Sequence, residues 1–390
     1  MRIERSFDVV VIGTGISGLA TAYHLQRLGI QRLAIAGPNL EASATSRSAG
    51  LISGGQVDNF TRIAQAHTAE RATALWRFGD AAFDALVAYL QRGGVKHLKN
   101  RRLRLLTSPS EQREAALAVA QMTANGLSAQ LIATKSTDPD GLLESLQSRI
   151  LGVQSDGGRG GWVDPKALLN KLQSDTATLP RLNVVQAIDD AGGAPLLRLM
   201  DGSTISCEIV VAAAHLQIRS LLPDLAPALV SFADQWLHLS LKHLPKDALG
   251  TAFSANNTHE WGVFSSPNRL RLGGARYLRP MAGIEATTPS VEPKVTAQLL
   301  ATLGEMFSFA EGAKILTSHA SLDINPCDEL PLIGPSFGSS RILVATGFMG
   351  TGLTTGFWAG KCLADLVAYG KAPDLPRFLW PERLRTLSSS

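Results

Sequence analysis

The first thirty residues carry the pattern that most restricts the fold of this chain. Residues 7–12 are a nearly continuous apolar run with β-branched side chains, typical of a strand buried on both faces of a parallel sheet. A GxGxxG run at 13–18 follows directly, and then a helix pattern over 19–28 with Gly29 at its C-cap. A strand, a glycine turn and a capped helix in this order predict a site for a dinucleotide.

Each glycine of the turn has a physical role in such a site. Gly13 permits the tight turn, Gly15 lets backbone amides approach a pyrophosphate, and Gly18 lets the helix pack closely on the strand. The predicted cofactor contacts here are Gly13, Gly15, Ile16, Ser17 and Gly18. The turn alone does not distinguish NAD from FAD, so an NAD(P)-dependent imine or opine dehydrogenase stays as one alternative.

One element of the dinucleotide pattern is missing from the second strand, residues 32–36. An acidic residue that hydrogen-bonds the adenosine ribose is expected about 20 residues after the glycines. Ala36 occupies that position, and the nearest carboxylate is that of Glu41. Because a hydrogen bond to a charged group contributes about 1.5–3 kcal/mol, we expect weaker dinucleotide binding than the pattern usually gives.

Composition excludes several classes of protein. Hydrophobic residues are 45% and charged residues 18% of the chain, so it is a folded globular protein. The net charge is only +4, and the basic cluster at 99–104 continues into leucines, so no nucleic-acid partner is expected. No apolar run reaches the ~20 residues of a membrane span. No room for a signal peptide precedes the first strand.

The three cysteines lie far apart in the sequence, at Cys207, Cys327 and Cys362, and none has metal-ligand spacing. A disulfide framework and a metal site are therefore not expected. The expected location is the reducing cytoplasm.

A loop after the second strand points to a family. Residues 44–55 run Ala-Thr-Ser-Arg-Ser-Ala-Gly-Leu-Ile-Ser-Gly-Gly. This resembles the Gly-Ala-Ser-x-Arg-Asn-x-Gly segment of D-amino-acid-oxidase-like FAD-dependent oxidoreductases. That family includes glycine oxidase, sarcosine oxidase, D-amino acid dehydrogenases and γ-glutamylputrescine oxidase. The resemblance implies phosphate contacts from Thr45, Ser46 and Arg47, and an isoalloxazine lining of Ala49, Gly50 and Leu51.

The C-terminal part continues the resemblance. Residues 328–335 are similar to the family's Asp-x-x-Pro-x-Ile-Gly segment, and 347–352 to its Gly-Phe-x-Gly-x-Gly segment, which closes over the flavin. A helix is predicted over roughly 354–368, and a helix N-terminus stabilises negative charge on the reduced ring. The implied cofactor contacts are Gly347, Phe348, Met349, Gly350, Thr351, Gly352 and Leu353.

The resemblance implies an α/β fold, α+β overall, with two interleaved domains. A Rossmann-like FAD-binding domain would comprise residues 1–85, 150–215 and 323–390. An antiparallel-sheet substrate domain would comprise 86–149 and 216–322. We expect FAD to be bound non-covalently, because Ser321 and Arg47 stand where some members attach the flavin, although Cys327 lies close to one of these places.

Family chemistry is hydride transfer from the carbon next to an amine to flavin N5, giving an imine. Asp323 stands where glycine-oxidase-like members carry an Arg for the substrate carboxylate, which favours an amine or cationic substrate. Arg271 takes the place of a Lys that sarcosine-oxidase-like members hold over the flavin. Each also has a structural alternative: Asp323 as a residue that caps a turn, and Arg271 as an outward-facing residue of a strand. Arg271, Asp323 and Met349 form the candidate catalytic set.

The predicted function is therefore oxidation of the C–N bond of a small amine or amino acid by an FAD enzyme. A catalytically weak flavin-fold subunit of a larger complex is the main alternative, motivated by Ala36 and by Asp323 in the Arg place. The electron acceptor (oxygen, a quinone or a partner protein) stays open.

Overall fold

A computed structural model describes residues 5–134, 141–190, 193–281 and 283–387. The chain forms two compact units. Unit 1 comprises residues 1–48, 165–232 and 323–390, and unit 2 comprises residues 49–164 and 233–322. Each unit is therefore assembled from separate segments of the chain, as expected for interleaved domains.

Three segments lie in a different unit from the domain to which the sequence prediction assigned them. Residues 49–85 and 150–164, which the sequence prediction placed with the FAD-binding domain, pack in unit 2. Residues 216–232, placed with the substrate domain, pack in unit 1. The reason in the first two cases is strand pairing, because β3 (Leu51–Ser53) and β4 (His97–Asn100) both pair with β8 (Gly160–Val163).

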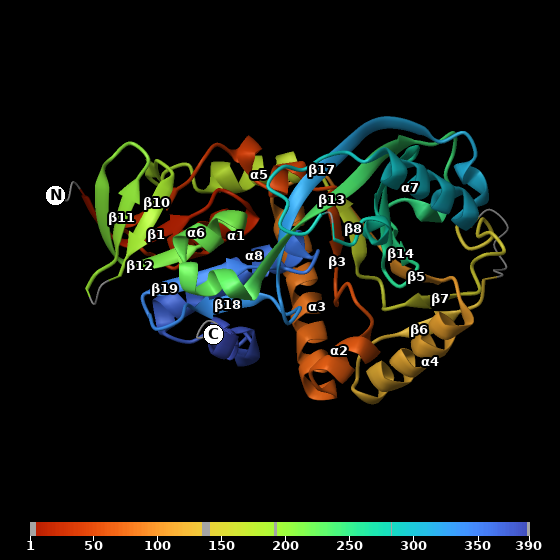
Figure 1. The fold of residues 1–390 in the computed structure, drawn as a ribbon, viewed down its shortest axis with the longest axis horizontal. Helices are drawn as coiled ribbons and strands as arrows, with labels where there is room; N and C mark the ends of the chain where they lie inside the picture. The colour runs from red at the N-terminus through yellow and green to blue at the C-terminus, as the bar shows by residue number, and fades with distance from the viewer. Residues whose placement is uncertain (1–4, 135–140, 191–192, 282, 388–390) are drawn as a thin grey trace. The chain divides into compact units, whose positions relative to one another are not determined.

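Unit 1 is built on a sheet with the strand order β10-β11-β12-β1-β2-β9, in which β19 also pairs with β12, and β18 with β19 (Figure 1). Strands β1, β2, β9, β12 and β19 run parallel, while β10, β11 and β18 pair antiparallel with their neighbours. The strands are β1 Arg5–Ile12, β2 Leu33–Ala36, β9 Arg181–Leu182, β10 Val185–Asp189, β11 Leu196–Leu199, β12 Thr204–Ala212, β18 Leu332–Pro335 and β19 Ile342–Thr346.

The first strand lies in the middle of this sheet, as its apolar sequence predicts. Val10 is fully buried and pairs with Ala34 on one side and Val210 on the other. The helices of unit 1 are α1 Ile16–Arg27, α5 Pro165–Asp175, α6 Ile218–Leu221 and α8 Gly352–Tyr369. Two parallel strands of the sheet, β1 and β19, each lead directly into a helix, α1 and α8.

Unit 2 contains an eight-stranded sheet in the order β17-β13-β16-β15-β14-β5-β7-β6, and the small sheet β3-β8-β4. The predicted antiparallel pairing is found between most neighbours, while β5 and β14 run parallel. Its strands are β5 Arg102–Leu106, β6 Gln130–Ile132, β7 Gly152–Ser155, β13 Leu229–Ser240, β14 Ala252–Ala255, β15 Glu260–Ser266, β16 Arg269–Gly274 and β17 Lys314–Pro326. The first residues of β13 and the last of β17 belong to unit 1.

The two faces of the large sheet differ. Leu237 and Leu239 of β13 and Leu270 and Leu272 of β16 belong to an apolar cluster with Leu299 of α7 (Pro293–Met306). Because side chains alternate along a strand, the residues between these leucines lie on the opposite face. On that face the small sheet packs through Trp162 against residues of β14 and β15.

The remaining helices of unit 2 are α2 Phe60–Ala66, α3 Ala69–Arg92 and α4 Pro109–Ala124. Each begins at a residue whose side chain accepts a backbone hydrogen bond: Asn59, Thr68 and Ser108. The helix predicted over residues 111–125 is α4. Local caps and apolar spacing, rather than long-range contacts, determine where these helices begin.

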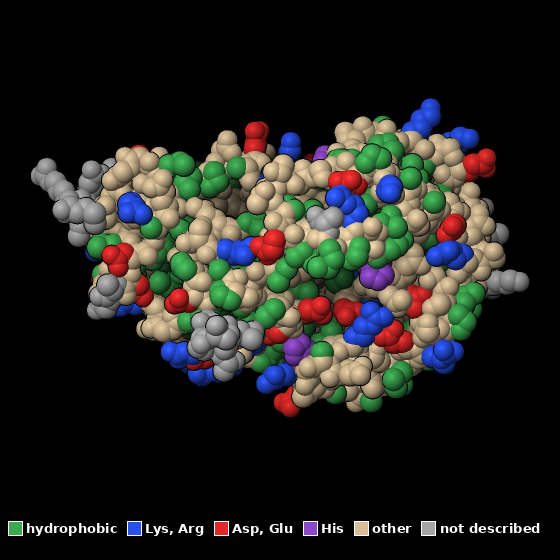
Figure 2. Space-filling model, viewed as in Figure 1, with side chains coloured by type: hydrophobic (Ala, Val, Ile, Leu, Met, Phe, Trp, Pro, Cys, Tyr) green, Lys and Arg blue, Asp and Glu red, His purple; other side chains and the backbone are tan. Residues whose placement is uncertain are grey.

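On the face shown in Figure 2, blue and red side chains lie interspersed over the described residues, without a broad field of one sign. A search of the described residues for a helix long and apolar enough to cross a bilayer found none. The cysteines are free, Cys327 exposed and the other two buried.

Candidate functional site

In the glycine turn between β1 and α1, one glycine has room for a side chain and two do not. A Cβ on Gly13, whose φ is +124°, would lie 2.2 Å from the carbonyl oxygen of Ala213, and one on Gly18 would lie 2.0 Å from that of Gly13. On Gly15 the nearest atom would be Thr45 Oγ1, at 3.4 Å. Gly13 and Gly18 therefore serve the packing of the turn, whereas Gly15 leaves its outer side free.

The first turn of α1 has unused amides. The Ile16 amide donates to Thr45 Oγ1 at 3.1 Å. The first amides of a helix have no partner inside it, and among the described residues none accepts from the amides of Ser17 or Gly18. These donors, at the positive end of the helix, suit a phosphate.

The loop from Thr45 to Arg47 forms a 3-10 turn, and its polar side chains are mostly engaged within the loop. The Ser46 hydroxyl lies within hydrogen-bond distance of the carbonyls of Glu41 and Ser43, and exposed Arg47 donates to the Ala42 carbonyl at 3.2 Å. Their contacts with phosphate stay a prediction.

Ser48, next along the chain, was not among the predicted contacts. Its hydroxyl oxygen is buried and has no hydrogen-bond partner among the described residues. A buried hydroxyl without a partner carries an uncompensated desolvation cost. The only sequence signal for Ser48 was its place in this polar loop.

The second glycine turn, between β19 and α8, also contains a glycine with positive φ that has no room for a side chain. Gly347 has φ +68°, and a Cβ there would lie 2.4 Å from Pro326 Cδ. Met349 has φ +50°, a left-handed conformation that costs a non-glycine residue energy. The Thr351 hydroxyl donates to the Phe348 carbonyl at 2.7 Å and so fixes the turn.

At the start of α8, two further amides are unused. Among the described residues, the amides of Gly352 and Leu353 have no acceptor, and the N-cap residue provides no side-chain cap. This helix N-terminus, like that of α1, offers free donors.

The two turns lie at the same edge of unit 1. β1 and β19 both run parallel to β12, and α1 packs on α8. A Cβ on Gly356 would lie 3.1 Å from Ile16 Cγ2, and one on Gly360 would lie 2.6 Å from the Thr21 nitrogen. Glycines on α8 thus let both helix N-termini come together beside the carboxyl ends of parallel strands, where ligands of such sheets bind.

The end of β2 lacks the ribose-binding acid, as the sequence indicates. Ala36 is fully buried in an apolar cluster with Val10 and Ile12, so this position offers no acceptor. The donors and glycines of unit 1 fit an FAD pyrophosphate, and the orphaned hydroxyl of Ser48 adds one polar group, but the ribose contact has no candidate here.

Asp323 and His215 form a pair within unit 1. His215 Nε2 lies 3.2 Å from Asp323 Oδ1, and both side chains are partly exposed. Asp323 lies within strand β17, where its Oδ1 also accepts from the Ile324 amide at 2.8 Å, so it does not cap a turn as the structural alternative supposed. His215 begins a 3-10 turn after β12 and Ala213–Ala214, and has φ +52°, in the left-handed region. The negative charge of Asp323 therefore has a partner within the protein.

The residues expected beside the isoalloxazine, Ala49, Gly50 and Leu51, belong to unit 2. The Ala49 carbonyl accepts from Trp162 Nε1 at 3.1 Å, and a Cβ on Gly50 would lie 2.2 Å from the Val163 carbonyl oxygen. These contacts explain the small residues as packing against β8. A role beside the flavin stays a prediction.

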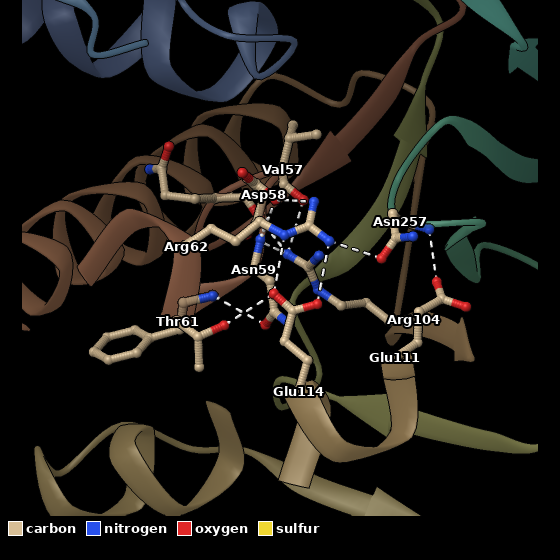
Figure 3. A network of polar contacts seen from close by, with 11 residues as sticks. Val57, Asp58, Asn59, Thr61, Arg62, Arg104, Glu111, Glu114 and Asn257 are labelled. Carbon is tan, nitrogen blue, oxygen red and sulfur yellow. Dashed lines mark hydrogen bonds and ion pairs between the residues drawn. The ribbon is translucent and has the colours of Figure 1, made fainter. Parts of the chain in front are cut away.

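The segment that follows β3 is held by a polar network (Figure 3). Arg104 of β5 is buried and donates to the carbonyls of Val57 at 2.8 Å and Asp58 at 2.5 Å. Burial and neighbouring Arg102 lower the pKa of Arg104 to about 10. Arg62 pairs with Glu114, Nε to Oε1 at 2.9 Å. These bonds fix residues 57–58, while Arg104 Nε is buried with no hydrogen-bond partner among the described residues and lies 3.9 Å from Asp156 Oδ2.

Arg271 lies in β16 of unit 2, on the face of the sheet opposite α7. It is half-buried, and its guanidinium lies over the ring of Trp236, 5.1 Å from Cζ to the ring centroid. Its predicted place over a flavin is not tested by contacts within unit 2.

Comparison with known proteins shows the family of this chain. A family model described as FAD dependent oxidoreductase matches residues 8–366. Among curated protein sequences there is no match.

Solved structures are similar in fold at low identity. Glycine oxidase from Geobacillus kaustophilus has TM-score 0.78 and 18% identity over 93% of this chain and 94% of that one. L-proline dehydrogenase from P. horikoshii has TM-score 0.82 and 15% identity over 98% and 99%. Iminodiacetate oxidase from Chelativorans sp. BNC1 has TM-score 0.71 and 19% identity over 96% and 98%. The predicted α/β fold is confirmed, and the family match over nearly the whole chain shows that it belongs to the FAD-dependent oxidoreductases.

Proposed function

We propose that this protein oxidises the C–N bond of a small amine or amino acid. The carbon next to the nitrogen loses a hydride, the nitrogen loses a proton, and the C–N single bond becomes C=N. Bound FAD would supply the two-electron acceptor, at its N5 atom. Water then hydrolyses the imine.

The observation that carries this proposal is the pair of helix N-termini at one edge of unit 1. Gly15 allows close approach at α1, where the Ser17 and Gly18 amides are free donors. The Gly352 and Leu353 amides offer a second set at α8. One set suits the pyrophosphate, and the other suits negative charge that develops on a reduced ring.

The relatives support the reaction class. Solved structures similar to this chain include a glycine oxidase, an L-proline dehydrogenase and an iminodiacetate oxidase. Each is named for oxidation of a compound with an amine nitrogen. Arg271, Asp323 and Met349 remain our candidates for groups that contact the substrate or the reacting ring.

The experiment begins with an absorption spectrum of the purified protein, before and after acid precipitation. Flavin bands that pass into the supernatant are expected, since FAD is proposed to be non-covalent. Amines and amino acids are then added anaerobically, and bleaching of the flavin bands identifies substrates. A flavin-containing protein that no amine or amino acid reduces would contradict the proposed reaction.

A weakly catalytic flavin-fold subunit is the second candidate, because Ala36 gives the adenosine ribose no carboxylate. A colourless protein that takes up no added FAD would favour it. The first candidate includes a cytoplasmic location and an electron acceptor that is oxygen, a quinone or a partner protein.

A further inference from the structure

His215, the partner of Asp323, follows the strand that lies between the two glycine turns. At its carboxyl end β12 pairs with β1 on one side and with β19 on the other, through Ala212 in both cases. β1 leads to the turn before α1, and β19 leads to the turn before α8. Because neighbouring strands lie about 4.8 Å apart, the end of β12 is within about one strand spacing of each turn.

Packing contacts hold both segments of this pair against the same two turns. The carbonyl oxygen of Ala213, two residues before the histidine, would lie 2.2 Å from a Cβ on Gly13. The Cδ of Pro326, three residues after the aspartate in β17, would lie 2.4 Å from a Cβ on Gly347. One segment of the pair therefore contacts the turn before α1, and the other contacts the turn before α8.

The backbone of His215 is strained. Its φ of +52° lies in the left-handed region, which costs energy for a residue other than glycine. Such strain persists where surrounding contacts impose it, and it is common at ligand sites. Glu208 and Arg341 form another exposed ion pair of unit 1, 3.0 Å apart, and neither residue has a positive φ. The histidine pair therefore differs from that surface pair in its backbone as well as in its position.

Asp323 determines which nitrogen of the His215 ring remains available. Its Oδ1 lies 3.2 Å from Nε2, and the carboxylate favours the tautomer with the proton on that nitrogen. Nδ1 of the neutral ring is then an acceptor, and no described residue forms a hydrogen bond with it. The two side chains are 33% and 40% exposed, so a ligand can reach them. The pair is thus suited to accept the proton of a hydroxyl group.

We propose that His215 Nδ1 accepts a hydrogen bond from a hydroxyl group of the ribityl chain of FAD, with Asp323 as the positioning residue. The ribityl chain joins the pyrophosphate to the ring, so between the turns before α1 and α8 it crosses the end of β12. The negative charge of Asp323 disfavours a phosphate or a carboxylate at this point, whereas a hydroxyl group is uncharged. This deepens the proposed function, because it rests on the pyrophosphate at α1 and the ring at α8. The action of Asp323 on His215 is independent of any contact with the substrate.

The first test compares FAD with ADP, which has the adenosine and the pyrophosphate but no ribityl chain. Both are titrated by calorimetry into the full-length apoprotein. His215→Gly should weaken FAD binding about three- to tenfold, the value of one hydrogen bond, and should leave ADP binding unchanged. The apoprotein of this variant should unfold at the same or a higher urea concentration, because glycine adopts positive φ without strain. An equal loss of affinity for FAD and ADP would overturn the proposal.

FAD analogues that lack the 2′-, 3′- or 4′-hydroxyl group of the ribityl chain test the contact itself. One of them should bind the wild type about three- to tenfold more weakly than FAD does. The same analogue should bind His215→Gly as tightly as FAD does, because both changes remove the same hydrogen bond. Additive losses for all three analogues would overturn the contact. If His215→Gly does not fold, His215→Asn takes its place, since asparagine tolerates positive φ.

The positioning role of Asp323 has its own variants. Asp323→Ala should lower FAD affinity by a similar factor, with no further loss when combined with His215→Gly. Asp323→Asn keeps an oxygen that accepts from Nε2–H, and it should retain most of the affinity. The matched control is Glu208→Ala, which removes an exposed carboxylate from an ion pair of the same unit and should bind FAD like the wild type. Equal FAD affinity in Asp323→Ala and Glu208→Ala would overturn the positioning role.

The outcomes separate this proposal from the proposed function. A loss of affinity specific to the ribityl chain, in a protein whose flavin no amine or amino acid reduces, would support the His215 contact and contradict the proposed reaction. Flavin reduction by an amine, in a protein whose FAD affinity does not depend on His215, would support the reaction and overturn the contact.

Discussion

Replacing Gly15 with alanine is expected to weaken FAD binding without unfolding the protein. A Cβ at this position meets Thr45 Oγ1 at 3.4 Å and no backbone atom within 4 Å. The backbone there has φ −78° and ψ −177°, which alanine adopts without strain. Alanine is a poorer N-cap than glycine, but it also has less entropy to lose on folding, and these effects of about 0.5 kcal/mol each nearly cancel.

The added methyl group occupies the space through which a phosphate would reach the first amides of α1. Losing one charge-assisted hydrogen bond costs about 1.5–3 kcal/mol, or about ten- to a hundred-fold in affinity. Apoprotein is titrated with FAD by quenching of flavin fluorescence, and urea unfolding of the apoprotein gives its stability. Gly13→Ala is the contrast, because its Cβ would lie 2.2 Å from a backbone oxygen and should destabilise the apoprotein itself. Unchanged FAD affinity in folded Gly15→Ala would refute the phosphate role of this turn.

Three further substitutions test other parts of the structure. Ser48→Ala should lower FAD affinity by about tenfold with no loss of apoprotein stability, because the Ser48 hydroxyl has no hydrogen-bond partner among the described residues. An FAD affinity equal to that of the wild type would show that Ser48 does not contact the cofactor. Arg104→Met should destabilise unit 2, because the carbonyls of Val57 and Asp58 lose their donor. The expected loss in the free energy of unfolding, measured with urea, is about 1–3 kcal/mol for each unpaired carbonyl. A loss of stability below about 1 kcal/mol would mean that water replaces the guanidinium. In the folded protein burial and the charge of Arg271 lower the pKa of His238 to about 4 from the ordinary value of 6.5, so between these pH values the folded protein binds fewer protons than the unfolded chain. The free energy of unfolding should therefore fall as pH falls from 6.5 towards 4. If the free energy of unfolding of His238→Asn fell in the same way, the pH dependence would come from other groups.

Local features of the sequence were sufficient to predict much of unit 1. Glycine spacing, a β-branched strand and helix caps act within about ten residues, so the βα turn at Gly13 and the start of α8 follow from sequence. The resemblance extended this to the family, which the family match confirms. The site residues themselves remain predictions, since contacts within the protein account for several of them.

Pairings across long sequence separations could not be predicted. His215 and Asp323 are 108 residues apart, and the bond from Ile16 to Thr45 spans 29 residues. Such contacts depend on strand order and register, which apolar periodicity does not specify. The same reason explains the segment 49–85, which follows the first strands in sequence but whose strand β3 pairs with β8 of unit 2.

The close packing of α1 on α8 also affects how the protein is made. α1 is among the first elements synthesised and α8 among the last, yet the two pack so closely that a Cβ on Gly360 of α8 would lie 2.6 Å from the Thr21 nitrogen of α1. At roughly 5–20 residues per second, the ribosome completes α8 tens of seconds after α1. β1 and α1 lack β12 for the first part of that time and β19 and α8 for all of it, so that part of their apolar surface stays exposed to other chains. Folding of unit 1 is therefore a late event that awaits the end of translation, and premature termination anywhere before α8 leaves an aggregation-prone fragment in place of a smaller working domain.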